Sequence, residues 1–230
     1  MEQSIQSTQQ STIQPVKKGK LISFEGLDGS GKTVTSLTVQ EMLEQRGDTV
    51  KYISFPQYDN SFFGPILKSV LFSENTPVVD VDPKLLTFLF AGDRFEAKTK
   101  IQTWLDQGYT VIANRYVPSN IAYGMAKSKD EEEFQIFNEQ FEYDICGIPR
   151  PDCVIYLDTP IEIIENRLKS KDQDGYEKNI SFLEKVRNCY LKLVKSSKNW
   201  KYVETYSVDQ QKILDPIDLS QMIISKYLTF

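Results

Sequence analysis

Residues 26–33 limit the possible folds of this chain more than any other segment, because they match the pattern G-x-x-x-x-G-K-[ST]. Glycines let the backbone turn tightly and bring its N–H groups to phosphate oxygens, and a following helix adds the partial positive charge of its N-terminus. Lys32 is placed to reach the β- and γ-phosphates of a nucleotide, and the Thr33 hydroxyl is placed to ligate Mg²⁺. The segment predicts a phosphate-binding P-loop, read as Gly26-Leu27-Asp28-Gly29-Ser30-Gly31-Lys32-Thr33.

The residues on either side of this loop agree with that interpretation. Residues 20–24 form a short apolar run that is typical of a buried strand. Between residues 33 and 46, Leu37, Met42 and Leu43 recur at helical spacing. The order of strand, glycine loop and helix favours a nucleotide site over a chance match in a surface turn.

Length and charge narrow the class of protein. A chain of 230 residues is long enough for one large α/β domain, which we place at residues 19–230 after a tail of residues 1–18. The start of that tail is rich in Ser, Gln and Thr, a composition that predicts disorder. A net charge of −5 disfavours nucleic acid as a partner. We find no apolar run as long as the ~18 residues that a transmembrane helix needs, and no signal peptide. We therefore expect a cytoplasmic protein.

The histidine and cysteine content excludes several kinds of chemistry. The chain has no histidine, so it cannot supply a Ser-His-Asp triad, a Cys-His pair or a His-ligated zinc site. Its three cysteines, Cys146, Cys153 and Cys189, form no C-x-x-C pair and are typical of reduced intracellular thiols.

Short apolar runs alternate with helical segments along the chain, which predicts a parallel sheet covered by helices on both faces. The expected strands are residues 20–24, 49–55, 109–113, 152–157 and 202–206. The expected helices are residues 33–46, 60–72, 82–107, 118–127, 131–143, 161–168, 180–194 and 216–227.

Ligands of such sheets bind at the carboxyl ends of the strands. The P-loop, Phe55-Pro56, Asn114-Arg115-Tyr116 and the segment after Asp158 should therefore converge. Arg115 directly follows a strand, where a guanidinium can clamp phosphate on two oxygens, although a salt bridge at a strand end is the alternative.

Two further patterns lie near this edge. Phe90 and Arg94 are spaced i, i+4 and share one helix face, which suits a base and its acceptor oxygen but equally suits a core Phe beside a surface Arg. Residues 168–178 are charged and contain Gly175, which indicates either a lid that closes over phosphates or a solvated connection.

With these pieces in place, residues 20–193 resemble thymidylate kinases, the nucleoside monophosphate kinases that transfer a phosphoryl group from ATP to dTMP in dTTP biosynthesis. The order and spacing of several motifs carry the resemblance: residues 24–33, 55–56, 89–94, 114–120, 151–152 and 176–177. It implies the P-loop NTPase fold, a five-stranded parallel sheet with a lid, Mg²⁺ as cofactor, and a homodimer.

The resemblance also implies roles for residues of the donor site and the reaction. Lys32, Arg115 and Asp28 would be catalytic, with Arg115 on the dTMP phosphate and Asp28 on the 3′-hydroxyl of the sugar. Arg167 would lie along the adenine of ATP, and Thr33 would bind the metal. The phosphates of ATP would contact Gly26, Gly29, Ser30, Gly31, Lys32 and Thr33.

The remaining implied roles concern the acceptor. Phe90 would stack on thymine and Arg94 would donate to a thymine carbonyl. Ser119 and Asn120 would line the thymine edge. The two other residues of this set are Phe55, as a wall of the pocket, and Tyr176, against C2′ of the deoxyribose.

The chain departs from the family pattern at a few positions. Asn114 stands where many members have Asp, which removes a carboxylate near the metal, and Tyr58 stands where some members carry an arginine. Gly29 occupies the position of a P-loop arginine found in others, so lysines would supply the extra charge on the γ-phosphoryl group. Two alternatives stay open: a deoxynucleoside kinase or similar enzyme, and a non-catalytic nucleotide-binding module. A GTP-binding switch protein is disfavoured, because we do not find in this sequence the Asn-Lys-x-Asp pattern with which such proteins bind guanine.

Overall fold

The computed structural model describes residues 18–169, 173–207, 209 and 211–229. Its centre is a five-stranded, fully parallel sheet, as predicted, with the strand order β2-β3-β1-β4-β5. The strands are β1 (Lys20–Glu25), β2 (Val50–Ser54), β3 (Thr110–Asn114), β4 (Cys153–Asp158) and β5 (Trp200–Glu204).

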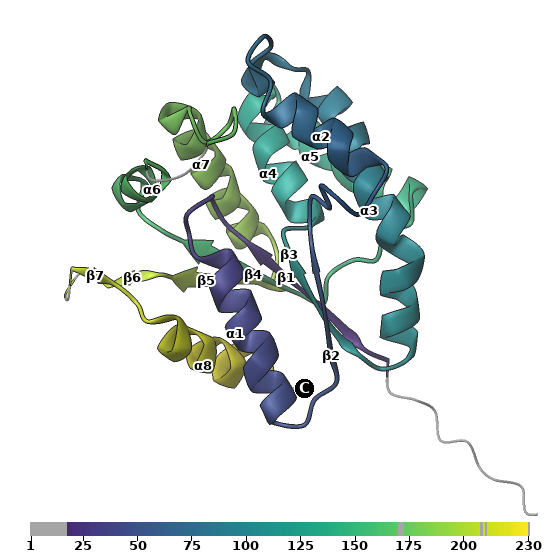
Figure 1. Cartoon of the computed structure of the whole chain (residues 1–230), viewed down its shortest axis with the longest axis vertical. Coiled ribbons are helices and arrows are strands. Elements are labelled where there is room, and N and C mark those ends of the chain that lie inside the picture. Colours follow the sequence, from purple (N-terminus) through teal and green to yellow (C-terminus); the bar gives the residue numbers. More distant parts are fainter. Residues whose placement is uncertain (1–17, 170–172, 208, 210, 230) are drawn as a thin grey trace, which may run out of the picture.

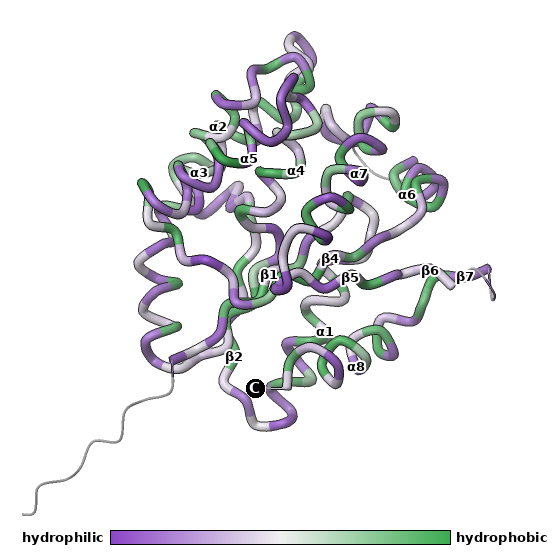
Figure 2. Tube along the Cα trace, turned by 180° about the vertical axis from the view of Figure 1, so that it is seen from behind, coloured by the Kyte–Doolittle hydropathy of each residue, from purple (hydrophilic) through white to green (hydrophobic). Residues whose placement is uncertain are grey.

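Helices cover both faces of the sheet, as Figure 1 and the reverse view in Figure 2 show. One face carries α1 (Lys32–Gln45) and α8 (Pro216–Tyr227). The helices on the other side are α2 (Phe63–Leu71), α3 (Pro83–Asp106), α4 (Val117–Lys127), α5 (Glu131–Glu139), α6 (Ile161–Leu168) and α7 (Ile180–Ser196).

Alternate residues along a strand pack into two separate hydrophobic cores, because successive side chains of a strand point to opposite faces of the sheet. Leu21 of β1 packs with Ile101 of α3 and Leu183 of α7 in one core. Ile22, its neighbour in β1, packs with Leu43 of α1 in the other. Burial on both faces explains why the strands read as continuous apolar runs.

The register brings the carboxyl ends of the inner strands to one edge. Phe24 near the end of β1 pairs with Asn114 at the end of β3, and Glu25 pairs with Tyr156 near the end of β4. Ser54, at the end of β2, also pairs with Asn114. The loops after these strands therefore converge on one edge, as the sequence predicts.

Local structure differs from the prediction in four places, one of which is β5, expected at residues 202–206 and found at Trp200–Glu204. The helix expected over residues 131–143 ends as α5 at Glu139 and continues as a π-helical segment, η2 (Gln140–Ile145). The expected start of α2 at residue 60 is wrong, since the helix begins at Phe63 with Pro65 in its first turn, where the missing N–H is tolerated. The short antiparallel pair β6 (Tyr206–Ser207) and β7 (Lys212–Ile213) and the 3₁₀ turn η1 (Val78–Asp80) were not expected from the sequence.

Of the predicted lid, residues 170–172 lie outside the described residues, as do residues 1–17 of the predicted tail. Its later part packs against the end of α2, where the Gly175 N–H donates to the Leu71 carbonyl oxygen at 2.8 Å. Asp174 Oδ1 accepts from the backbone N–H groups of Tyr176 and Glu177 at 2.8 and 2.9 Å, so this turn is held by its own side chain. Movement of this segment as a lid stays a prediction.

Candidate active site

The loop between β1 and α1 takes a backbone path that requires glycine. The φ angle is 147° at Gly26, 81° at Gly29 and 92° at Gly31. A Cβ atom at Gly26 would lie 2.6 Å from the carbonyl oxygen of Leu157 on β4, so glycine at this position also lets the loop sit on the sheet. Gly31 precedes α1 without a side-chain cap, an arrangement that suits binding of an anion by the first N–H groups of the helix.

Lys32 is buried at the start of α1. Its Nζ donates to the carbonyl oxygen of Leu27 at 2.8 Å and lies 3.7 Å from Asp28 Oδ1. Burial lowers the pKa of Lys32 to about 7, with the positive charge of Arg115 acting in the same direction and Asp28 opposing it. The ammonium group is therefore held in a place where a polyanion would favour its charged form.

Arg115 follows β3 with a φ angle of 62°, a left-handed conformation that is uncommon for a side chain of this size. Its Nη2 donates to Asp28 Oδ2 at 2.6 Å, and its Nη1 donates to Ser119 Oγ at 3.2 Å. The guanidinium carbon lies 5.4 Å from the centre of the Tyr123 ring. These contacts fix the guanidinium fork between the P-loop and α4.

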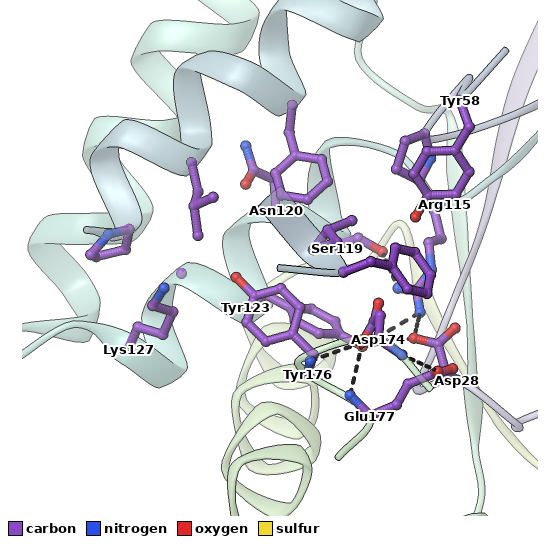
Figure 3. Close-up of a pocket in the computed structure, with 17 residues that line it drawn as sticks. Asp28, Tyr58, Arg115, Ser119, Asn120, Tyr123, Lys127, Asp174, Tyr176 and Glu177 are labelled. Atoms are coloured by element: carbon purple, nitrogen blue, oxygen red, sulfur yellow. Dashed lines mark hydrogen bonds and ion pairs between the residues drawn. The ribbon is translucent and has the colours of Figure 1, made fainter. Parts of the chain in front are cut away.

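Two cavities meet at this arginine. The P-loop cavity has a volume of about 640 Å³, and the inner cavity, between α3, α4 and the turn after α6, has a volume of about 240 Å³. Both are lined by Asp28, Pro56, Tyr58 and Arg115. Figure 3 shows Asp28, Arg115 and Glu177 gathered at one end of the inner cavity and Lys127 at the other. The shared residues place a charged junction between two separate binding spaces.

The inner cavity has aromatic and apolar walls. Phe90 and Leu86 of α3 line it together with Tyr123 of α4. Tyr176 is buried in it, with its ring stacked on Phe182 at 5.2 Å and in edge contact with Tyr123 at 5.1 Å. The structure thus brings Phe90 and Tyr176 into the space where the sequence analysis expects an acceptor base and sugar.

Ser119 and Asn120 both line the inner cavity from the first turn of α4. Ser119 Oγ donates to Glu25 Oε2 at 2.5 Å and lies 2.9 Å from the Tyr190 hydroxyl oxygen. Glu25 is fully buried, and this burial raises its pKa against the opposing effect of the Ser119 hydrogen bond. Ser119 is therefore held in place by two hydrogen bonds, one to the buried carboxyl group of Glu25 and one from Arg115.

Arg94 is not among the residues that line the inner cavity. Its side chain is buried, with Nε donating to Glu142 Oε2 at 2.6 Å and Nη2 donating to Glu142 Oε1 at 2.7 Å. Burial alone would lower the pKa of Arg94, but the charge of Glu142 and its hydrogen bonds together outweigh burial and raise the pKa. The expected contact of Arg94 with a thymine carbonyl stays a prediction, since the structure turns the guanidinium to Glu142.

Phe55 and Arg167 both line the P-loop cavity. Phe55 was expected as a wall of the acceptor pocket, yet its buried ring packs on Tyr116 with 5.8 Å between centres and does not line the inner cavity. Arg167 Nη1 donates to the Gly29 carbonyl oxygen at 2.5 Å, which holds the end of α6 on the P-loop. Ile213 and Leu214 also line this cavity and give it an apolar part.

Thr33 and Asn114 lie together on the floor of the P-loop cavity. The Nδ2 atom of Asn114 is 3.1 Å from Thr33 Oγ1, and Asn114 Oδ1 is buried with no hydrogen-bond partner among the described residues. The residue that replaces the usual carboxylate therefore contacts the hydroxyl predicted to bind the metal.

Sequence reasoning assigned no role to Tyr123, Lys127, Asp174 and Glu177, which also line the inner cavity. The α4 residues had a signal, because Ser119, Tyr123 and Lys127 recur at intervals of four and share a helix face. Lys127 Nζ donates to the carbonyl oxygen of Val78 at 2.6 Å, and burial lowers its pKa to about 8. Asp174 and Glu177 belong to the predicted lid, and burial raises the pKa of both.

Comparison with known proteins decides the family. The family model described as thymidylate kinase matches residues 24–213. The chain belongs to the thymidylate kinase family. This match spans every strand of the five-stranded sheet except the first residues of β1, and it includes the P-loop and the residues that line both cavities up to β7.

Individual thymidylate kinases share much of the sequence and the fold. The chain is 35% identical over 196 residues to probable thymidylate kinase 1 of Saccharolobus solfataricus, covering 85% of this chain and 93% of that protein. It also matches a solved structure of thymidylate kinase from Candida albicans with a TM-score of 0.68 and 25% identity, covering 90% of this chain and 92% of the other. Broad substrate specificity is described for that Candida enzyme. Within the described residues of this chain, no helix is both long enough and apolar enough to cross a bilayer.

Proposed function

We propose that this protein transfers the γ-phosphoryl group of ATP to dTMP, giving ADP and dTDP, and that Lys32, Arg115 and Asp28 carry the reaction. The observation that supports this assignment best is the junction of the two cavities. A donor in the P-loop cavity and an acceptor in the inner cavity would meet where Arg115 and Asp28 line both spaces. Phosphoryl transfer depends mainly on such positioning and on stabilisation of charge.

The donor site uses the P-loop for the phosphates and α6 for the base. The N–H groups around Gly29, Ser30 and Gly31 would bind the β- and γ-phosphates at the start of α1. Arg167, held against Gly29 by a hydrogen bond, would lie along the adenine. Ile213 and Leu214 line the same cavity and would give the adenine an apolar surface.

The acceptor site uses the inner cavity. Phe90 would stack on thymine, Ser119 and Asn120 would line the edge of the base, and Tyr176 would fill the space beside C2′ of the sugar. Arg115 would bind the dTMP phosphate with the N–H groups that now donate to Asp28 and Ser119. Asp28, at the same junction, would accept a hydrogen bond from the 3′-hydroxyl of the sugar.

In the transfer step, a phosphate oxygen of dTMP forms a bond to the γ-phosphorus as the bond from that phosphorus to the β,γ-bridging oxygen breaks. The electron pair of the broken bond stays on ADP. Lys32 lines the P-loop cavity and Arg115 lines both cavities, so both would stabilise the charge on the transferring group. The packed turn of Asp174–Glu177 would exclude water, which would otherwise compete with dTMP as acceptor.

Mg²⁺ is part of this proposal, and the residues present fit it. Thr33 Oγ1 lies on the floor of the P-loop cavity beside Asn114, and a hydroxyl oxygen is a suitable ligand for this hard cation. When bound, Mg²⁺ screens the charge of the ATP phosphates. Because Mg²⁺ usually keeps several waters and takes nucleotide phosphates as ligands, Asn114 in place of a carboxylate is compatible with binding.

A panel of acceptors tests the function. We expect ADP release with ATP and dTMP, with lower efficiency for dUMP by roughly tenfold to a hundredfold, since one methyl group in an apolar pocket contributes only about 1–3 kcal/mol. Thymidine, which lacks the phosphate that Arg115 would bind, should give no turnover. Faster turnover of thymidine than of dTMP would indicate a deoxynucleoside kinase, and no turnover of any acceptor would indicate a binding module.

Substitution Phe90→Ala should raise KM for dTMP roughly tenfold and leave KM for ATP near its original value. The ring lines the inner cavity and not the P-loop cavity, and stacking on a base contributes about 1–3 kcal/mol in nucleic-acid sites. Steady-state kinetics with each substrate varied in turn gives both values. Phe62→Ala is the control, because the Phe62 ring is exposed and lines neither cavity. An equal rise of both KM values would instead assign Phe90 to the core.

Binding of an ATP analogue should take up protons through Lys32. Its pKa of about 7 in the free protein lies below the ordinary value, and bound phosphates favour the charged form and raise it. At about pH 8.5 the Lys32 amine of the free protein is mostly neutral and the triphosphate is fully ionised, so we expect uptake of nearly one proton per site. Calorimetry in buffers of different ionisation enthalpy measures this number, and binding heats that do not depend on the buffer would contradict the role of Lys32.

We also propose a homodimer, since three large apolar side chains of α3 are exposed. Leu85, Phe88 and Phe95 have 53%, 46% and 53% of their surface exposed, more than an isolated helix face usually presents without a partner. Light scattering should give twice the chain mass of 26.5 kDa, and a single-chain mass at micromolar concentration would exclude it. The free thiols of Cys146, Cys153 and Cys189 fit the reducing cytoplasm in which we place the protein.

A further inference from the structure

A buried aspartate of α3 holds the loop of residues 56–61, which follows β2 and is called the junction loop below. Asp93 Oδ2 accepts from the backbone N–H of Gln57 at 2.9 Å, and its Oδ1 accepts from the Ser61 hydroxyl at 2.6 Å. Gln57 Nε2 adds longer contacts of 3.4 Å to the same carboxylate and to the Asp93 carbonyl oxygen. These partners lie 36 and 32 positions away in the sequence, so one carboxylate ties both ends of the junction loop to a distant helix.

Two other residues of α3 hold the segment that comes directly after the junction loop. Glu96 Oε1 accepts from the backbone N–H of Phe63, the first residue of α2, at 3.2 Å. Gly92 lets the ring of Phe63 lie against the helix, since a Cβ atom at Gly92 would be only 2.5 Å from Cζ of that ring. The position of the junction loop is therefore set by α3 as well as by the strand before it.

The junction loop carries Tyr58 to the place where the two cavities meet. Tyr58 and Pro56 line both the P-loop cavity and the inner cavity. Figure 3 shows Tyr58 at the same end of the inner cavity as Arg115 and Asp28. Burial raises the pKa of the Tyr58 hydroxyl, and the charge of Asp174 acts in the same direction, so the group keeps its proton at neutral pH. It is an uncharged hydrogen-bond donor at a charged junction.

We propose that Asp93 is a positioning residue for phosphoryl transfer, which fixes the junction loop on α3 and so holds the Tyr58 hydroxyl where it donates a hydrogen bond to the transferring group. Asp93 lines neither cavity, so its effect on the reaction passes through the loop that it binds. The positive charge at the junction comes from Lys32 and Arg115, and a neutral donor adds a hydrogen bond without further charge. This inference rests on the proposed function, because it takes the junction as the meeting place of donor and acceptor phosphates.

The first test is the kinetics of Asp93→Ala. We expect kcat to fall about tenfold, since the lost hydrogen bond acts on a charged group, while KM for ATP and for dTMP each change by less than about threefold. The matched control is Asp106→Ala, which removes an exposed carboxylate of the same helix that accepts from Gln102 at 2.7 Å and should keep kcat. An unchanged kcat in Asp93→Ala, or a loss confined to KM for dTMP, would overturn the inference.

Asp93→Asn separates the position of the loop from the charge of the carboxylate. The amide oxygen can accept from the Gln57 N–H, and the amide nitrogen can donate to Ser61 Oγ. The Ser61 hydroxyl then donates to the Gln57 carbonyl oxygen, 3.2 Å away, and still accepts from the Gly64 N–H at 2.8 Å. We therefore expect Asp93→Asn to keep kcat within about threefold of the original protein. A loss as large as in Asp93→Ala would show that charge matters and would contradict a positioning role.

A double-mutant cycle tests whether Asp93 acts through Tyr58. Tyr58→Phe alone should lower kcat about tenfold, and adding Asp93→Ala should lower it by less than about twofold more. Equal falls in both backgrounds would overturn the inference. Should Asp93→Ala fail to fold, Ser61→Ala removes one of the two loop contacts and keeps the buried carboxylate. It should lower kcat in the original protein and not in Tyr58→Phe, and full activity of Ser61→Ala would count against the inference.

Hydrogen exchange distinguishes this inference from the proposed function, because it needs no turnover. The backbone N–H of Gln57, which donates to Asp93, should exchange at least about tenfold faster in Asp93→Ala and at nearly the original rate in Asp93→Asn. This result in a protein that does not phosphorylate dTMP would support the fixing of the loop and refute the function. Exchange that Asp93→Ala leaves unchanged, in a protein that does phosphorylate dTMP, would refute the positioning role alone.

Discussion

Lys32→Ala should lower kcat with ATP and dTMP by at least about a hundredfold while the protein stays folded. The ammonium group would act on charge that develops during transfer, and removal of one such donor commonly costs this much in rate. Among the described residues, its Nζ donates to the Leu27 carbonyl oxygen, so the substitution removes one side-chain hydrogen bond. The pKa of Lys32 is about 7 in the folded protein and 10.5 in the unfolded chain, so between these pH values the unfolded chain binds more protons at Lys32. Burial of this group therefore lowers the free energy of unfolding of the free protein most at low pH. We therefore expect an unchanged or higher Tm for the variant.

The control for this result is Lys20→Ala. Lys20 is the first residue of β1, at the opposite end of the strand from the P-loop, and its Nζ forms a half-exposed ion pair with Asp152 at 2.9 Å. Loss of this pair should leave kcat unchanged. Turnover of Lys32→Ala within a few-fold of the original protein would show that the P-loop lysine does not serve the transfer.

Arg115→Lys should lower kcat/KM for dTMP by roughly a hundredfold and change KM for ATP little. A lysine keeps the positive charge and meets the same backbone demand at a φ angle of 62°, but it cannot reproduce a planar fork that binds phosphate on two oxygens. The two N–H groups that now reach Asp28 and Ser119 are the ones that the acceptor phosphate would use. Initial rates with each substrate varied in turn give the two constants.

Arg187→Lys provides a matched comparison, because Arg187 of α7 holds Asp158 at the end of β4. Like Arg115, Arg187 binds an aspartate, here through two nitrogens at 2.7 Å to each oxygen of Asp158, but it lines neither cavity. We expect this variant to lose thermal stability and to keep its kinetic constants. Equal kinetic losses in Arg115→Lys and Arg187→Lys would mean that Arg115 supports the fold and does not bind the acceptor.

The sheet and its ligand-binding edge were predictable because they depend on local sequence. The inner strands β1, β3 and β4 are buried on both faces, so runs such as residues 109–113 read as continuous apolar segments. Parallel strands share the direction of their carboxyl ends, so placing Arg115 after such a run was sufficient to bring it to the P-loop. The Arg115–Asp28 contact at 2.6 Å is a consequence of that rule.

The partners of individual side chains were not predictable, because they depend on residues far apart in the sequence. Arg94 and Phe90 share a helix face by spacing, yet Arg94 turns to Glu142, which is 48 positions away. That glutamate lies where a regular helix was expected, and the π-helical turn changes which way it faces. Phe55 was expected as the last residue of a strand and directly follows β2, and its packing on Tyr116 places it in the P-loop cavity, a result of tertiary contacts alone.

Transfer of a labelled phosphoryl group in a single turnover tests the account most directly. ATP labelled at the γ-phosphorus is mixed with excess protein, dTMP and Mg²⁺, and the products are separated by chromatography. We expect the label in the β-phosphate of dTDP, with one ADP formed for each dTDP. Label that appears only as inorganic phosphate, with dTMP unchanged, would contradict the proposal that the two cavities hold donor and acceptor for direct transfer.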